Sequence, residues 1–217
     1  MKVPSLLYGL VLAAAPLSAV SIPVANFSFE TPVLGTPGGF TSTVPSWVVG
    51  GAEATFQPAI PGQATAIPDG VQVLALGNGS AGTASQDTGV ALAANTTYTL
   101  SLDILQRADF ALSNYTIALF AGATPLASQN TPVVPGPGAF LADSLVYTSS
   151  ALPPLGNLII QLSATGNASS VAFIPGQADF DNVTLTAVGG GGVPEPSALV
   201  LGGLGLLPLF LLRRRRS

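Results

Sequence analysis

The side chains that could do chemistry in this chain are almost all carboxylates. The 217 residues include no histidine and no cysteine, so no imidazole or thiolate can act as a nucleophile, proton relay or metal ligand. Serine triads and thiol proteases of the usual kinds are excluded with them. Between Val20 and Pro194 the only base is Arg107. The same stretch holds nine acids, namely Glu30, Glu53, Asp69, Asp87, Asp103, Asp109, Asp143, Asp179 and Asp181.

The charge of this middle region limits its partners. One base against nine acids gives a net charge of −8. Such a surface repels phosphate backbones, so we expect no nucleic-acid partner. It tolerates cations and neutral sugars.

Two of the acids have a spacing that invites a catalytic interpretation. Asp179 and Asp181 form a carboxylate pair of the kind that glycoside hydrolysis uses. Alternate residues of one strand lie about 7 Å apart whatever their function, so the spacing does not select this chemistry. Because histidine and cysteine are both absent, a structural or metal-binding use of these carboxylates is favoured. The sequence therefore predicts that the protein is not an enzyme.

The N-terminal residues 1–21 read as a secretory signal peptide. Lys2 precedes an apolar run from Leu6 to about Leu17, and small residues follow, with Ala19 and Ser21 as candidate ends of the removed piece. A short membrane anchor or a buried first helix is the alternative. A run of about a dozen residues is too short to span a bilayer, which favours cleavage.

The C-terminal residues predict a membrane segment followed by a cytoplasmic tail. Residues 197–212 are apolar throughout and would form a helix about 24 Å long, against a hydrocarbon core of about 30 Å. Arginine side chains can lengthen the effective span. Arg213, Arg214, Arg215 and Arg216 lie in the tail 213–217 and fix the orientation, with everything before Pro194 outside. A polybasic tail for anionic lipid or nucleic acid is the weaker alternative.

The stretch before this helix supplies a sorting motif. Residues 189–196 combine a glycine run with Pro194, Glu195 and Pro196, so they predict an extended, exposed linker. The order of motif, apolar helix and terminal arginines resembles the PEP-CTERM sorting signal, also described as an ice-binding protein C-terminal domain. The resemblance implies export through the inner membrane of a Gram-negative bacterium. It also implies processing by an exosortase-like enzyme and delivery to the cell surface or extracellular matrix.

Residues 22–188 predict one all-β domain, a jelly-roll β-sandwich between the two terminal signals. In TTYTLSLDIL, Tyr98, Leu100, Leu102 and Ile104 face one way and polar residues face the other. NYTIALF repeats the alternation, and VQVLAL, NLIIQLSAT and NVTLTAV are further strands. Gly/Pro clusters such as TPGG and PGPG separate them. Many short alternating strands with turn signals favour two packed sheets.

Three short motifs place this domain near a known group. NFSFETP opens it, PSW follows and DFDNVTL closes it. This order resembles the galactose-binding-like jelly rolls found among carbohydrate-binding modules. The resemblance implies a structural calcium ion where the first and last strands meet, with Glu30 and Asp181 as candidate ligands. Phe180 and Val183 cannot both face the core of a regular strand, so we expect a bulge near Asp181 that turns its carboxylate inward.

Other singled-out residues have ordinary explanations. Trp47 is the only tryptophan, and a core anchor between the sheets is favoured over a sugar-binding platform. Six asparagines occur in N-x-S/T, at positions 26, 78, 95, 114, 167 and 182. With a bacterial sorting tail, turn asparagines before threonine-rich strands are favoured over glycosylation.

The sequence therefore predicts an exported, non-enzymatic protein of the cell surface or exopolysaccharide matrix. Two roles stay open. One is a carbohydrate-binding module that holds extracellular polysaccharide. The other is a structural matrix or coat protein with no small ligand. Apart from a structural calcium ion, the sequence predicts no cofactor.

Overall fold

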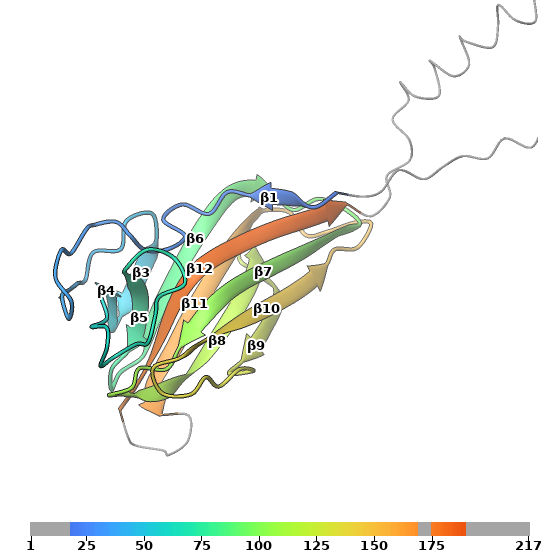
Figure 1. The fold of residues 1–217 in the computed structure, drawn as a ribbon. Coiled ribbons are helices and arrows are strands. Elements are labelled where there is room, and N and C mark those ends of the chain that lie inside the picture. The colour runs from blue at the N-terminus through green and yellow to red at the C-terminus, as the bar shows by residue number, and fades with distance from the viewer. Residues whose placement is uncertain (1–17, 169–174, 190–217) are drawn as a thin grey trace, which may run out of the picture.

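The computed structural model describes residues 18–168 and 175–189, and these form a β-sandwich (Figure 1). The alternating segments become strands as expected, and no helix in the described residues is long and apolar enough to cross a membrane. The strands are β1 (Val20–Ile22), β2 (Phe40–Thr41), β3 (Val48–Gly51), β4 (Glu53–Phe56), β5 (Val73–Gly77), β6 (Gly82–Ala91), β7 (Thr96–Leu105), β8 (Ala111–Ala121), β9 (Thr124–Asn130), β10 (Phe140–Thr148), β11 (Asn157–Ala168) and β12 (Gly176–Gly189).

The strands divide into two mainly antiparallel sheets. Sheet A runs β2-β4-β5-β12-β7-β10, with β1 also paired to β12. Sheet B runs β3-β6-β11-β8-β9. A two-residue parallel contact between the start of β12 and the start of β8 joins them at one end. At the other end Val20 pairs with Ala187, so the two described ends of the domain lie together (Figure 1).

The core fills the space between the two sheets. Tyr98, Leu100, Leu102 and Ile104 of β7 are all buried, which confirms the predicted alternation. Trp47 belongs to the same cluster and its ring lies 5.4 Å from that of Phe29, so the core-anchor interpretation is confirmed. Because alternate residues of a strand face opposite ways, the polar side chains of sheet A lie on its outer face, away from this core.

The predicted irregularity in β12 is confirmed. The pairing of β12 with β7 shifts register between Asp181 and Thr184, and Asn182 has a positive φ of 52°. The shift lets Phe180 and Val183 both reach the core. Asp181 has no exposed surface, but it faces away from the core opposite Asp103, and residues 57–72 cover it; the expectation that the bulge turns its carboxylate inward is wrong.

Two segments without regular secondary structure, residues 57–72 and 106–110, cover part of the outer face of sheet A. Loop 57–72, between β4 and β5, donates the Asp69 amide to Asp181, and its Gln63 carbonyl accepts the Ala108 amide. Ala108 lies in turn 106–110, between β7 and β8. A small apolar cluster of Phe56, Val73 and Ala75 lies beneath this cover, apart from the main core. The outer face over β4, β5 and the first half of β12 is therefore shielded from water, whereas Ser144, Val146 and Thr148 on the outer face of β10 stay exposed.

A buried polar cluster ties the two sheets together near the open edge of the sandwich. The Tyr115 hydroxyl on sheet B lies 3.0 Å from a carboxylate oxygen of Asp143 on sheet A. The Gln129 amide donates to the other oxygen of Asp143 at 2.8 Å. Burial and the Asp143 charge raise the pKa of Tyr115, so the hydroxyl stays a donor at all ordinary pH values.

Replacing Tyr115 by phenylalanine should lower the free energy of unfolding by about 1–3 kcal/mol, because a buried carboxylate loses a donor that nothing else replaces. Chemical denaturation of the purified chain measures this. Tyr147→Phe is the matched control, since the Tyr147 hydroxyl makes no hydrogen bond to any residue in the described part of the chain. Equal effects of the two substitutions would show that the cluster does not stabilise the fold.

Candidate active site

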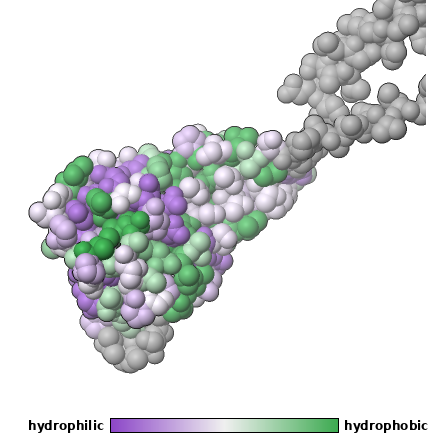
Figure 2. Space-filling view, in the orientation of Figure 1, coloured by the Kyte–Doolittle hydropathy of each residue, from purple (hydrophilic) through white to green (hydrophobic). Residues whose placement is uncertain are grey.

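A cavity of about 440 Å³ opens at the end of sheet A opposite the two described chain ends. Its lining includes Phe40, Ala54, Phe56, Ala75, Arg107 and Gln177. Figure 2 shows hydrophobic residues bordered by hydrophilic ones at the end of the molecule where β4 and β5 lie. The volume is typical of a small-molecule site, and Glu53, Gln63 and Asn78 also line it, so polar and apolar side chains share the wall.

Strand register explains where the hollow lies. Ala54 pairs with Ala75, and Ala75 pairs with Asp179, so these three side chains lie side by side on the outer face. The two alanines leave space that larger residues would fill. Phe40 pairs with Phe56 in the next row and the two rings flank that space. The hollow therefore offers room for a flat ring beside the two phenylalanines, with polar side chains elsewhere on its wall.

Asp179 is the unusual group beside this hollow. It has no exposed surface, and its Oδ1 accepts a 2.6 Å hydrogen bond from the Gln177 amide. Its Oδ2 is buried and has no hydrogen-bond partner among residues 18–168 and 175–189. Burial raises the pKa of Asp179 to about 7, although the Gln177 hydrogen bond and the Arg107 charge both lower it. At neutral pH a substantial fraction of Asp179 is therefore a neutral acid that can give up a proton.

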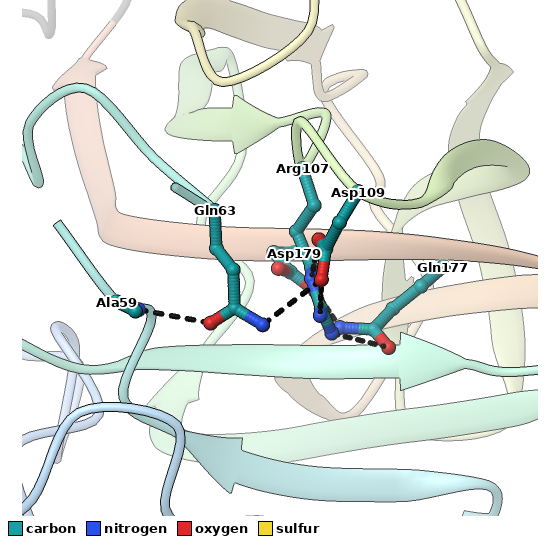
Figure 3. Close-up of polar contacts among 6 residues, drawn as sticks. All are labelled: Ala59, Gln63, Arg107, Asp109, Gln177 and Asp179. Atoms are coloured by element: carbon teal, nitrogen blue, oxygen red, sulfur yellow. Dashed lines mark hydrogen bonds and ion pairs between the residues drawn. The ribbon is translucent and has the colours of Figure 1, made fainter. Parts of the chain in front are cut away.

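Arg107 forms the polar wall of the cavity. It is ion-paired with Asp109, with its Nη2 2.6 Å from Oδ2 and its Nε 2.9 Å from Oδ1. Its guanidinium also lies 4.7 Å from the centre of the Phe56 ring. The pairing with Arg107 lowers the pKa of Asp109, so Asp109 is an anion at neutral pH, where part of Asp179 still carries its proton. Figure 3 shows Arg107, Asp109 and Gln177 converging beside Asp179.

The structure brings the two candidate calcium ligands to one loop. Glu30 accepts the amides of Val71 and Gln72 through Oε1, at 2.8 and 2.7 Å. Asp181 accepts the Asp69 amide at 3.1 Å and its neighbour Asn182 at 2.7 Å. Burial raises the pKa of Asp181 to about 7, against the effect of these two hydrogen bonds. Both carboxylates therefore anchor loop 57–72.

Calcium binding at this loop stays a prediction. No group of three or more His, Cys, Asp or Glu that could hold a metal ion is found in residues 18–168 and 175–189. Calcium takes six to eight oxygens, so carbonyls and water would have to complete the shell. If calcium binds, EDTA should lower the melting temperature of the purified chain and added calcium should restore it. Melting that neither treatment changes would contradict the site.

The remaining predicted site residues lie outside the described part of the chain. These are the sorting motif Pro194, Glu195 and Pro196 and the orientation residues Arg213, Arg214, Arg215 and Arg216. The same holds for the signal peptide up to residue 17 and for the apolar run 197–212. Their roles stay predictions.

Comparison with known proteins decides the family. The family model described as "HpiC1-like: HpiC1 cyclase" matches residues 20–186, which is most of the chain and nearly all of the sandwich. The chain belongs to the HpiC1-like family. None of the curated proteins compared with it matches significantly.

Solved cyclases share the fold. The Stig cyclase Fisc from Fischerella sp. TAU, in complex with (3Z)-3-(1-methyl-2-pyrrolidinylidene)-3H-indole, is 26% identical with a TM-score of 0.67, covering 78% of this chain and 98% of its own. A cyclase from Fischerella sp. TAU in complex with 4-(1H-indol-3-yl)butan-2-one is 25% identical with a TM-score of 0.63, covering 77% and 97%. The xylan-binding module CBM22-1 from Paenibacillus barcinonensis is 14% identical with a TM-score of 0.49, covering 81% and 99%, which is too distant to support sugar binding.

These findings correct the functional predictions. The expectation of a non-enzymatic matrix protein, with or without a bound polysaccharide, is wrong, because the family that matches the whole sandwich is one of cyclases. The prediction that the protein is not an enzyme is wrong for the same reason. It rested on the missing histidine and cysteine, and a buried carboxylic acid needs neither. The sandwich architecture itself is confirmed.

Sequence reasoning considered Asp179 and set it aside. One part of the signal was in the sequence: Asp179 lies between Ala178 and Phe180, which face the core, so its own side chain must face the other way. What the sequence does not reveal is that loop 57–72 and turn 106–110 cover that face. Without the cover, Asp179 reads as an ordinary solvent-facing acid.

Proposed function

We propose that this protein is a cyclase that uses Asp179 as a general acid on an unsaturated, ring-bearing substrate held in the cavity of sheet A. The observation that carries the proposal is a fully buried carboxyl, with one oxygen unpartnered, that lies behind the cavity wall as the strand neighbour of Ala75 and the hydrogen-bond partner of Gln177, both of which line the cavity. Family membership supports the reaction class. The indole compounds bound by the related cyclases support an aromatic ring as part of the substrate.

The proposed reaction balances without a cofactor. The O–H bond of Asp179 breaks and its hydrogen forms a C–H bond on a substrate double bond, which leaves a carbocation. A second double bond or the aromatic ring attacks that cation and closes a C–C bond. A proton then leaves carbon and returns to the Asp179 carboxylate, so the product is an isomer of the substrate.

The surroundings of Asp179 suit this chemistry. Phe40 and Phe56 lie along the cavity, where aromatic faces favour a nearby cation. The described residues contain a single base, Arg107, which is paired with Asp109, and this leaves the site poor in free positive charge. Because Asp179 has no exposed surface, side chains at the cavity floor must shift when the substrate binds.

A conversion screen tests the proposed function. The purified chain is incubated with indoles that carry one or more alkenyl groups, and products are separated by liquid chromatography with mass detection. A product of unchanged mass, new retention time and fewer alkene hydrogens in its NMR spectrum is expected for at least one substrate. Heat-denatured protein is the control for spontaneous cyclisation. No conversion of any alkenyl indole above that control would contradict an indole-directed cyclase.

We also propose that the enzyme is exported and held at the membrane before processing by an exosortase-like enzyme. Support comes from the sequence of residues 1–21 and 193–216, with the PEP-CTERM resemblance described above. Both described ends of the sandwich lie at the end opposite the cavity (Figure 1). An attachment there leaves the cavity unobstructed.

Substitution of the sorting motif tests the export proposal. Replacing Pro194, Glu195 and Pro196 with alanine should leave membrane insertion intact and trap the uncut form, because the apolar run is unchanged. Cell fractionation with size read by immunoblot measures this. Release and shortening like those of the unaltered protein would show that the motif is not the processing signal.

A further inference from the structure

The orientation of one amide decides which oxygen of Asp179 is free. Gln177 and Asp179 are two residues apart on β12 and face the same way, and the Gln177 Nε2 donates to Asp179 Oδ1 at 2.6 Å. Resting on the proposed function, we propose that Gln177 is a positioning residue that reserves Oδ2 for the acid hydrogen, and that Arg107 acts through Gln177 by fixing the orientation of its amide.

Arg107 selects the orientation because it can only donate. Its Nη1 lies 3.5 Å from Oε1 of Gln177, so the amide oxygen faces the guanidinium and the NH₂ group faces Asp179. If the amide were flipped, the NH₂ group of Gln177 would face the N–H groups of Arg107, and two donors would meet without an acceptor. The flip would also turn an acceptor toward Asp179.

Arg107 is itself firmly placed. Two hydrogen bonds hold it to Asp109, at 2.9 and 2.6 Å, and Asp109 also accepts the Gln63 amide at 3.0 Å. The rings of Phe56 and Phe110 lie 4.7 and 5.5 Å from the guanidinium carbon. The arginine is therefore a fixed reference point for the Gln177 amide (Figure 3).

The fixed amide has a chemical consequence at Asp179. Since Oδ1 already accepts an N–H, the hydrogen of the neutral acid sits on Oδ2, which has no hydrogen-bond partner in the described part of the chain. With the amide flipped, Oε1 of Gln177 would accept that hydrogen and hold it away from the substrate. The chain thus keeps its acid hydrogen on the oxygen that is free to give it up.

Kinetics of three variants test this positioning. Gln177→Met keeps the side-chain length and removes the N–H, so we expect kcat to fall about tenfold or more with KM nearly unchanged. Arg107→Met should also lower kcat, and the double variant should be no slower than Gln177→Met alone, because the two residues act as one unit. Gln161→Met, on β11 of the other sheet, is the matched control and should keep full activity. Independent, multiplying losses would overturn the proposal.

A structural measurement separates this proposal from the proposed function. In the NMR spectrum of the full chain, one hydrogen of the Gln177 NH₂ group should be shifted and slow to exchange, and both features should vanish in Asp179→Leu and in Arg107→Met. Persistence in Arg107→Met would overturn the role of Arg107. An oriented amide without turnover would contradict only the proposed function. If Gln177→Met does not fold, Gln177→Asn, whose amide is too short to reach, takes its place.

Discussion

Asp179→Asn should abolish cyclisation, with kcat lowered by about 10²–10⁴-fold, the range that general acid catalysis usually supplies. Asparagine has the shape of aspartate and still accepts the Gln177 hydrogen bond through its amide oxygen. It has no acidic hydrogen to give up. The loss should therefore appear in catalysis while the fold and ligand binding remain.

The control for this substitution is Asp87→Asn. Asp87 is exposed on β6 and its carboxylate accepts hydrogen bonds from the Gly89 amide and the Asn157 side chain, away from the cavity. Steady-state kinetics on a substrate from the alkenyl-indole screen compare the two variants. Asp179→Asn retaining more than about a tenth of the activity would remove Asp179 from the acid role.

The protein should be markedly more stable at pH 5 than at pH 8. Asp179 and Asp181 both have a pKa of about 7 in the folded state, raised mainly by burial from an ordinary value of 3.8. A raised folded-state pKa gives stability that is fully present below pH 4 and is lost as the pH rises through about 7. At about 1.4 kcal/mol per pKa unit, each carboxyl contributes on the order of 4 kcal/mol at most.

Thermal melting of the purified chain across this pH range measures the effect. The melting temperature should rise by several degrees on acidification from pH 8 to pH 5. The Asp179→Asn variant should show a shallower dependence, because one of the two titrating groups is gone, and Asp87→Asn should not differ from the unaltered protein. The lowered pKa of Asp109 acts only in more acidic solution and does not oppose the trend. Melting that is flat or that falls on acidification would show that the two carboxyls are not buried as described.

Much of the sandwich follows from local pattern. The alternation in β7 and β8 is complete enough to name the buried residues, and the spacing of Phe180 and Val183 forces the bulge in β12. These features depend on residues that are close together along the chain, and so they can be predicted from the sequence. The position of Trp47 follows from the size and apolar character of its side chain.

The site depends on register between distant segments. Ala54, Ala75 and Asp179 meet only because β4, β5 and β12 pair with a particular offset, and no local pattern sets that offset. The pKa of Asp179 is raised only because residues far along the chain cover it and remove water. Its charge was visible in the sequence, whereas its pKa is a property of the fold.

The resemblance to carbohydrate-binding modules shows a related limit. The motifs NFSFETP and PSW mark turns before β2 and β3, and DFDNVTL is the middle of β12. These motifs indicate the fold, and one of them contains both Asp179 and Asp181, which lie on the same strand. Nothing in those letters distinguishes a strand that anchors a loop from one that presents an acid to a cavity.

Cyclisation in D₂O tests the central claim most directly. If Asp179 gives its hydrogen to carbon and a different carbon-bound hydrogen leaves, the product formed in D₂O carries one deuterium at a former alkene carbon. Mass spectrometry detects the added deuterium and NMR locates it, and Asp179→Asn should form no labelled product above the uncatalysed background. Product formed at the full enzymatic rate without deuterium would contradict acid catalysis by Asp179.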